Sequence, residues 1–164
     1  MDKDRFQFHK DFMRMLVNMA APRYRCNRPP GPSGAAIYIN TYNYTQIVYG
    51  FVEPVHGQRL KSCIDVGCEL EDGHCIRNIH AEQRAITEAA RIGVATKDAA
   101  IFSILKPCYA CTKHILAAGI TTIYYAGIAY DEQRTRDLLD DAYVHAYYID
   151  VGLPYGQELI KERK

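Results

Sequence analysis

Two short motifs, one helix and one strand apart, constrain this chain more than any other feature. The first is H-x-E at His80 to Glu82, and the second is P-C-x-x-C at Pro107 to Cys111. Between them, residues 79–92 contain no Pro or Gly and are rich in Ala, Glu and Arg, which predicts a helix. The apolar run at 99–105 predicts a buried strand, and Pro107 can begin a second helix. The motifs are therefore expected at the starts of two helices that flank one strand.

One imidazole and two thiolates make a zinc site with a free position. His80, Cys108 and Cys111 would supply three tetrahedral ligands, and such an open site is typical of catalytic zinc. Zinc makes a bound water acidic enough to lose a proton near neutral pH. Glu82 follows His80 too closely to be needed as a ligand, so its carboxylate is the predicted proton carrier. The two cysteines lie at a helix N-terminus, where the helix dipole favours thiolates.

Each motif alone has a simpler interpretation. A lone C-x-x-C in an intracellular chain is often a structural zinc site or a redox pair, and a lone H-x-E means little. Together, in this order and at this spacing, the two motifs predict a zinc-dependent nucleobase deaminase with Glu82 as the catalytic acid and base.

The sequence around the motifs also resembles a known family. Residues 63–86 (CIDVGCELEDGHCIRNIHAEQRAI), the P-C-x-x-C motif and the following AAGITTIYYA are similar to the deoxycytidylate (dCMP) deaminases, especially the bacterial late-competence and phage branch. The resemblance implies a three-layer α/β/α cytidine deaminase-like fold with a mixed five-stranded sheet. It implies zinc-dependent hydrolysis of dCMP to dUMP and ammonia, which feeds dTMP synthesis. It also implies homo-oligomers with active sites near subunit interfaces, and dCTP and dTTP as effectors.

Composition and charge agree with a single domain. The 164 residues, 48% of them hydrophobic, suffice for one core and predict one domain over 1–164. A net charge of +1 argues against a protein that grips long nucleic acid. The start MDKDRF is charged and no apolar run reaches membrane-spanning length, so a cytoplasmic protein without membrane contact is expected.

Two departures from the family pattern bear on the substrate. The stretch Gly50 to Pro54 corresponds to the family's G-Y-N-G-x-P loop, but Val52 stands where the family has asparagine. Glu53 would repel a phosphate if it pointed inward. In the active-site helix, Arg84 replaces the asparagine of H-A-E-x-N-A and adds charge and length. These changes leave dCTP or a 5-substituted dCMP open as substrates beside dCMP.

Residues that could hold the nucleotide come from several segments. Guanidinium groups can bind a phosphate bidentately, and the loop 23–33 is rich in arginine and contains a C-x-R element like that of the family. The alternative for each arginine is a solvated surface, and most tyrosines are expected in the core or an interface. The candidate substrate-binding residues are Arg28, Arg84, Ala81, Pro107 and Tyr130.

A second zinc site is predicted in the long segment at 55–78. Loops of this length are usually functional or cross-linked, and this one is rich in soft ligands. Cys26, Cys68 and Cys75 would bind the metal, with Cys63 or His74 as the fourth ligand. The alternative is a set of free thiols that pack like small hydrophobic side chains.

The secondary structure of the flanking segments is predicted from the spacing of their apolar residues. A first helix is predicted at 4–21, with an apolar face formed by Phe8, Phe12, Met15, Leu16 and Met19. A β-hairpin is predicted at 35–40 and 46–52. A strand at 121–126, a helix at 131–141 and a strand at 146–151 predict a parallel pair with a helical crossover. The tail at 154–164 is expected to be a short helix or frayed.

Two further classes of function are kept as alternatives. The tRNA adenosine deaminases share H-A-E and P-C-x-x-C, but an enzyme that acts on a base within RNA favours a basic surface, and this chain lacks a basic excess. A non-catalytic zinc-containing nucleotide-binding module is the other alternative. A structural zinc does not need Glu82, so its presence argues against that module.

Overall fold

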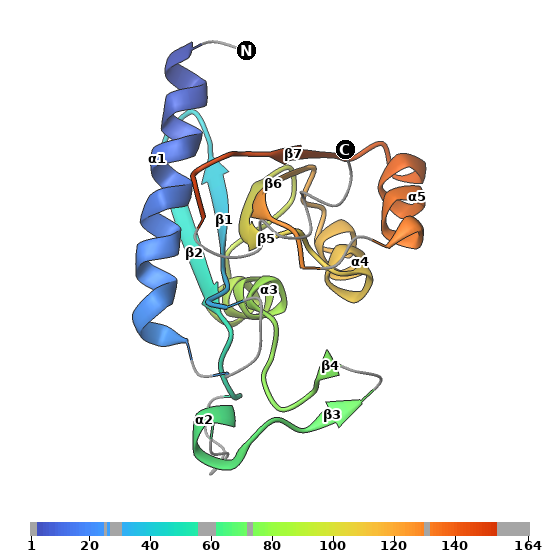
Figure 1. Cartoon of the computed structure of the whole chain (residues 1–164). Helices are drawn as coiled ribbons and strands as arrows, with labels where there is room; N and C mark the ends of the chain where they lie inside the picture. Colours follow the sequence, from blue (N-terminus) through green and yellow to red (C-terminus); the bar gives the residue numbers. More distant parts are fainter. Residues whose placement is uncertain are drawn as a thin grey trace.

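A mixed five-stranded sheet forms the middle layer of the molecule (Figure 1). The computed structural model describes residues 3–24, 26, 31–55, 62–71, 74–129 and 132–153, with Lys3 and His74 described by their backbone only. In the strand order β2-β1-β5-β6-β7, β1 is antiparallel to β2 and β5, whereas β5, β6 and β7 are parallel. The strands are β1 (Gly34–Asn40), β2 (Thr45–Phe51), β5 (Ala100–Leu105), β6 (Thr122–Gly127) and β7 (His145–Tyr148).

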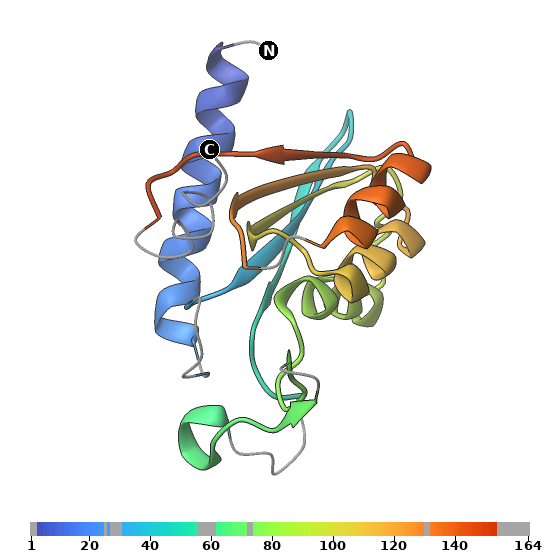
Figure 2. The same cartoon turned by 45° about the vertical axis from the view of Figure 1, so that its right-hand side comes forward.

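Helices cover both faces of the sheet (Figure 2). Helix α1 (Lys3–Ala20), followed by a 3-10 turn at Ala21–Arg23, packs on one face. Helices α3 (Ala81–Arg91), α4 (Tyr109–Ala117) and α5 (Gln133–Asp141) lie on the other. The predicted three-layer α/β/α fold with its parallel β6–β7 pair is confirmed. Within the described ranges, no helix combines the length and the apolar character that a membrane span needs.

The buried face of α1 differs from the predicted one. Phe12 and Leu16 are buried as expected, but Phe8 and Met15 are 42% and 39% exposed. Met13, fully buried, and His9 line the sheet instead. The reason is the helical period: positions 9, 12, 13 and 16 form one stripe, and positions 8 and 15 lie at its edge. Hydrophobicity alone does not mark which edge of a wide stripe meets the sheet.

The predicted hairpin is present as β1 and β2, and β2 packs directly on α3. At Gly50, a Cβ atom would lie 2.2 Å from the carbonyl oxygen of Ala81 and 2.3 Å from the backbone nitrogen of Ala85. Only a residue without a side chain permits this approach. Strand β2 therefore touches the helix that begins directly after His80 and contains Glu82.

The segment between β2 and α3 is more structured than its sequence predicted. It contains a short helix, α2 (Cys63–Val66), and a two-stranded ribbon of β3 (Leu70–Glu71) and β4 (His74–Cys75). Figure 1 shows these elements together at one end of the molecule, beyond α3. Strands of two residues are too short to produce a periodic pattern, which is why they were not predicted. The predicted tail at 154–164 lies outside the described residues.

Candidate metal sites and the adjoining cavity

The two sequence motifs meet at the N-terminal ends of α3 and α4. His80 and Cys108 are the residues immediately before these helices, both with extended backbone, and Cys111 lies in the first turn of α4. Nδ1 of His80 lies 3.3 Å from Sγ of Cys111 and 3.6 Å from Sγ of Cys108. His80 was expected inside the first helical turn, and it instead precedes the helix. Its backbone nitrogen donates to Oε1 of Gln83 at 3.4 Å, which closes the first turn.

The three donor atoms fit one zinc ion. Tetrahedral ligands bound at about 2.0–2.3 Å are separated from one another by roughly 3.3–3.8 Å. The measured separations from His80 agree with this, and all three donor atoms lie within 4.8 Å of one another. Among the described residues, no other His, Cys, Asp or Glu joins this group. The donor set therefore fits a zinc that keeps one position open.

Glu82 lies beside this group and is held by a hydrogen bond. Its side chain is 5% exposed, and Oγ of Ser103 on β5 donates to its Oε1 at 2.7 Å. The hydrogen bond with Cys108 raises the pKa of His80, and the negative charge of Glu82 contributes to the same shift. Ser103 was not identified from the sequence. The available signal was a polar residue inside the apolar run at 99–105, which fits a buried polar contact as well as any special role.

The pKa values of the two thiols are shifted in opposite directions. A hydrogen bond with Cys111, assisted by His80, lowers the pKa of Cys108 to about 4. The hydrogen bond with Cys108, together with burial, raises the pKa of Cys111 above its ordinary value. Cys108 is therefore the more acidic of the two thiols.

A cavity of about 670 Å³ opens beside His80 and Cys108. Three cationic side chains line it: Arg77 from the segment before α3, Lys113 from α4 and Arg134 from α5. One carboxylate, Glu132, lines it as well and forms an ion pair with Arg134. Lys113 and Arg134 both lie over the ring of Tyr109, at 5.1 and 4.7 Å from its centroid. These cations were not identified from the sequence, because basic side chains on helix surfaces give no pattern that separates them from solvated ones.

Asn78 forms part of the same cavity wall and was also not identified from the sequence. It is 5% exposed, and its Nδ2 donates to Sγ of Cys63 at 3.3 Å. Its Oδ1 is buried and has no hydrogen-bond partner among the described residues. An unpaired buried carbonyl oxygen costs free energy.

The two departures from the family pattern form an ion pair. Nη2 of Arg84 donates to Oε1 of Glu53 at 3.0 Å, and the Arg84 side chain is only 9% exposed. Ile79, next to His80, also donates its backbone N–H to the carbonyl of Glu53 at 3.1 Å. Glu53 is thus turned toward Arg84, and neither residue is among those that line the cavity.

The remaining candidate substrate residues divide into two groups. Ala81 and Pro107 are buried beside the metal-binding group, next to His80 and Cys108 in the chain. Arg28 and Tyr130 lie outside the described residues.

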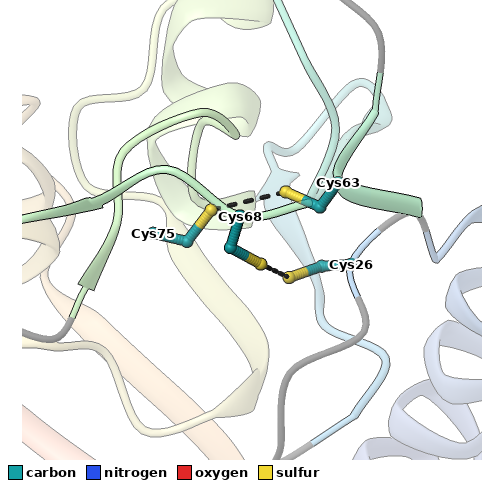
Figure 3. Close-up of side chains that lie close together, drawn as sticks. All are labelled: Cys26, Cys63, Cys68 and Cys75. Carbon is teal, nitrogen blue, oxygen red and sulfur yellow. Dashed lines mark hydrogen bonds between the residues drawn. The ribbon is translucent and has the colours of Figure 1, made fainter. Parts of the chain in front are cut away.

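A second group of ligands is formed by four cysteines (Figure 3). The sulfurs of Cys26 and Cys68 are 3.6 Å apart, and those of Cys63 and Cys75 are 3.4 Å apart. All four lie within 4.8 Å of one another, and none is in a disulfide. Tetrahedral zinc with bonds to sulfur of about 2.3 Å requires sulfur separations of roughly 3.8 Å, so the group fits a closed structural site. Cys63 occupies the place for which the sequence left Cys63 and His74 as alternatives, while the His74 side chain lies outside the described residues.

The protonation of Cys75 also suits metal binding. Burial opposes its ionisation, but hydrogen bonds from Cys63 and from the backbone of Arg77 and Asn78 lower the pKa of Cys75 to about 7. The same backbone stretch leads directly into His80. The four-cysteine group and the His80 group are therefore joined by a short piece of chain.

The α/β/α fold and the group of one histidine and two cysteines place this chain in a class of zinc-binding deaminase domains. Residues 6–127 match the cytidine and deoxycytidylate deaminase zinc-binding region, and the chain belongs to this family, as predicted. Among curated proteins, ComE operon protein 2 of Bacillus subtilis (strain 168) is 38% identical over 89 residues. That alignment covers 54% of this chain and 47% of the relative, so it spans about half of the relative's length.

Solved structures show how widely this fold is used. A dCMP deaminase from the cyanophage S-TIM5, in complex with dCMP and dUMP, has a TM-score of 0.70 and 24% identity over 90% of this chain and 98% of its own. A guanine deaminase from Nitrosomonas europaea has a TM-score of 0.55 and 13% identity, covering 87% of this chain and 77% of its own. At these identities the similarity shows the fold, and the base that each enzyme accepts has to be argued separately.

Proposed function

We propose that this protein is a zinc-dependent hydrolase that deaminates a free cytosine deoxynucleotide, converting dCMP to dUMP and ammonia. The single observation that carries the proposal is the buried carboxylate of Glu82 beside an open His–Cys–Cys group. A structural zinc site is closed by a fourth protein ligand and does not require a buried carboxylate beside it.

The residues have separate roles in this reaction. His80, Cys108 and Cys111 would hold the zinc, which when bound increases the acidity of water. An oxygen from water replaces the amino group at C4, and ammonia leaves. Glu82 accepts one proton from the water and delivers it to the ring nitrogen, and it then carries the second proton of the same water to the leaving amine. Ser103 holds one carboxylate oxygen of Glu82 at 2.7 Å, which leaves the other oxygen for proton transfer.

An excess of cations in the cavity wall supports an anionic substrate. Arg77, Lys113 and Arg134 lie in the wall that His80 and Cys108 also line, against one carboxylate, Glu132, which is paired with Arg134. A phosphate group attracts such cations strongly. The cyanophage structure with dCMP and dUMP supports the same substrate by analogy. A product dUMP would feed dTMP synthesis.

A turnover assay across related nucleotides tests the substrate. Release of ammonia is measured with dCMP, dCTP, cytidine and 5-hydroxymethyl-dCMP. We expect dCMP to give the highest kcat/KM and cytidine, which lacks phosphate, to give a much lower value. A preference for dCTP or for the 5-substituted nucleotide would move the assignment to that substrate, and no turnover of dCMP would contradict it.

We further propose a second, structural zinc bound by Cys26, Cys63, Cys68 and Cys75. Metal analysis of pure, active protein should give two zinc ions per chain, and a Cys26→Ser variant should give one. One zinc in the unmodified, fully active protein would contradict the second site. Homo-oligomeric assembly, regulation by dCTP and dTTP, a single domain over residues 1–164 and a cytoplasmic location stay predictions.

A further inference from the structure

The three cations of the cavity wall differ in how far they are already bound to other protein groups. Arg77 is engaged within its own segment, where its Nε donates to the carbonyl of Gly67 at 3.0 Å and its Nη2 pairs with Glu69 at 3.5 Å. The ammonium of Lys113 contacts the Tyr109 ring and has no hydrogen-bond or ion-pair partner among the described residues. Lys113 is therefore available to a ligand, whereas Arg77 already stabilises the fold.

Arg134 is engaged on one edge of its guanidinium group. Its Nε donates to Oε2 of Glu132, and its guanidinium carbon lies 4.7 Å from the centroid of the Tyr109 ring. Within the part of the chain that the structure describes, its two terminal nitrogens make no hydrogen bond. The side chain is 63% exposed. A guanidinium with a free edge can bind a phosphate through two parallel hydrogen bonds.

Tyr109 holds both of these cations near the group of proposed zinc ligands. It follows Cys108 directly in the chain, and the Lys113 ammonium lies 5.1 Å from its ring centroid. Two like charges at one ring repel each other, and an anion bound close to both would reduce this repulsion. A nucleotide with its base at the metal has its phosphate one sugar away. Lys113 and Arg134 likewise lie one aromatic side chain away from Cys108.

We propose that Lys113 and Arg134, held against the Tyr109 ring, bind the 5′-phosphate of the nucleotide, and that Glu132 restricts the site to a monophosphate. The inference rests on the proposed function, because it takes a cytosine deoxynucleotide as the ligand of the cavity. A phosphate monoester carries about 1.5 to 2 negative charges near neutral pH, which two cations can neutralise. Each further phosphate group adds negative charge near Glu132, whose carboxylate repels it. Glu132 therefore disfavours dCTP more than dCMP.

Steady-state deamination of dCMP and of deoxycytidine tests the role of Arg134. Arg134→Gln should lower the ratio of the two kcat/KM values, dCMP over deoxycytidine, by about tenfold to a hundredfold, because only dCMP has the phosphate. Arg134→Lys keeps the charge without the planar pair of donors, so it should recover part of this ratio. An unchanged ratio in Arg134→Gln, including one in which both substrates lose activity equally, would overturn the phosphate assignment.

Arg136→Gln is the matched control on the same helix. Arg136 donates from its Nε and Nη2 to Gln133, and it is not among the residues that line the cavity. The substitution removes the same charge from α5, but the ratio of the two kcat/KM values should change by less than about twofold, because charges on exposed side chains are screened. A fall as large as that of Arg134→Gln would overturn the specific role of Arg134.

Glu132→Gln tests the discrimination between one phosphate and three. The glutamine oxygen can still accept from Nε of Arg134, so the guanidinium stays in place while one negative charge is lost. The kcat/KM of dCTP relative to that of dCMP should rise severalfold, and this rise should become smaller at high ionic strength. A relative value equal to that of the unmodified chain would refute the role of Glu132.

The outcomes separate this inference from the proposed function. If dCMP is deaminated and Arg134→Gln behaves like the unmodified chain, only the inference fails. If dCMP is not turned over, both fail together. Zinc content and circular dichroism of each variant show that it is folded.

Discussion

At the scale of single residues, the proposed proton carrier, Glu82, is the position expected to be most sensitive to substitution. We expect Glu82→Gln to lower kcat by a factor of about 10² to 10⁴, because the amide cannot accept and return a proton. The zinc content should not change, since Glu82 is not among the three grouped donor residues. Ammonia release and metal analysis on the same preparation measure both effects. Turnover equal to that of the unmodified chain would remove Glu82 from the mechanism.

Ser103→Ala complements the Glu82→Gln variant, because it tests whether the hydrogen bond from Ser103 orients the Glu82 carboxylate. The hydroxyl donates to Glu82 at 2.7 Å, and Ser103 is fully buried. Its loss leaves the carboxylate in place but less well held, so kcat should fall by less than in Glu82→Gln, and KM should change little. A larger effect on KM than on kcat would instead indicate that Ser103 contacts the substrate.

The Arg84–Glu53 ion pair is a residue-scale feature with a structural effect. Arg84 is largely buried, and replacing its guanidinium removes the hydrogen bond and ion pair with Glu53, so we expect Arg84→Gln to lower the free energy of unfolding by about 1–3 kcal/mol. Urea denaturation of the zinc-loaded protein measures this change.

The same helix supplies the control for that measurement. Arg91 pairs with Glu88 on α3, but its side chain is 68% exposed. Arg91→Gln should therefore change stability by less than about 0.5 kcal/mol. Equal effects of the two substitutions would mean that the Arg84–Glu53 pair does not fasten the substrate loop to α3.

At the scale of elements, the contact between β2 and α3 sets the position of the catalytic helix. Gly50→Ala would place a methyl group against backbone atoms of Ala81 and Ala85 at 2.2 and 2.3 Å, and backbone cannot turn aside. We expect the substitution to push α3 from the sheet and to lower stability by about 1–3 kcal/mol. Because His80 begins this helix, zinc affinity should fall as well, and both are measured by thermal unfolding with and without added zinc.

Gly34→Ala is the matched control on the neighbouring strand. There a Cβ would meet the Phe51 ring at 3.1 Å and the Cβ of Ala20 at 3.2 Å. These are side-chain atoms and can shift by a few tenths of an ångström, so the loss of stability should be smaller and zinc affinity unchanged. A Gly34→Ala loss as large as that of Gly50→Ala would mean that close backbone approach is not the cause.

At the scale of the whole molecule, the two proposed metal sites would join segments that are far apart in the sequence. The four-cysteine group ties the chain after α1 to the segment before α3, and the His80 group ties α3 to α4. Metal bound only by the folded state adds its binding free energy to stability. We therefore expect a chelator to lower the melting temperature in two stages, as one zinc and then the other is withdrawn.

Scanning calorimetry at increasing chelator concentration, with zinc measured in parallel, follows these stages. The Cys26→Ser variant should start from a lower melting temperature and show one stage only. A single stage in the unmodified chain, with both metals lost together, would show that the two sites do not release metal independently.

What the sequence determined by itself is local. The spacing of H-x-E and P-C-x-x-C predicted that His80, Cys108 and Cys111 lie together near Glu82, because each motif fixes its own residues at the start of one helix, and the intervening strand places both starts at the same edge of a sheet. The order of α1, the strands of the large sheet and α3 to α5 was likewise predicted from the sequence, whereas α2, β3 and β4 were not. The predicted apolar face of α1 was only partly right. The helical period identifies a stripe of apolar residues, but it does not show which edge of the stripe packs against the sheet.

What only the tertiary structure decided is pairing between distant segments. Ser103 with Glu82, Arg84 with Glu53, Asn78 with Cys63, and Cys63 as the fourth member of its group all join residues whose sequence neighbourhoods contain no trace of the partner. The physical reason is that a hydrogen bond or ion pair depends on distance and direction within a few ångströms. A sequence pattern indicates whether a side chain is buried or exposed. Which atom that side chain contacts is determined by the tertiary structure.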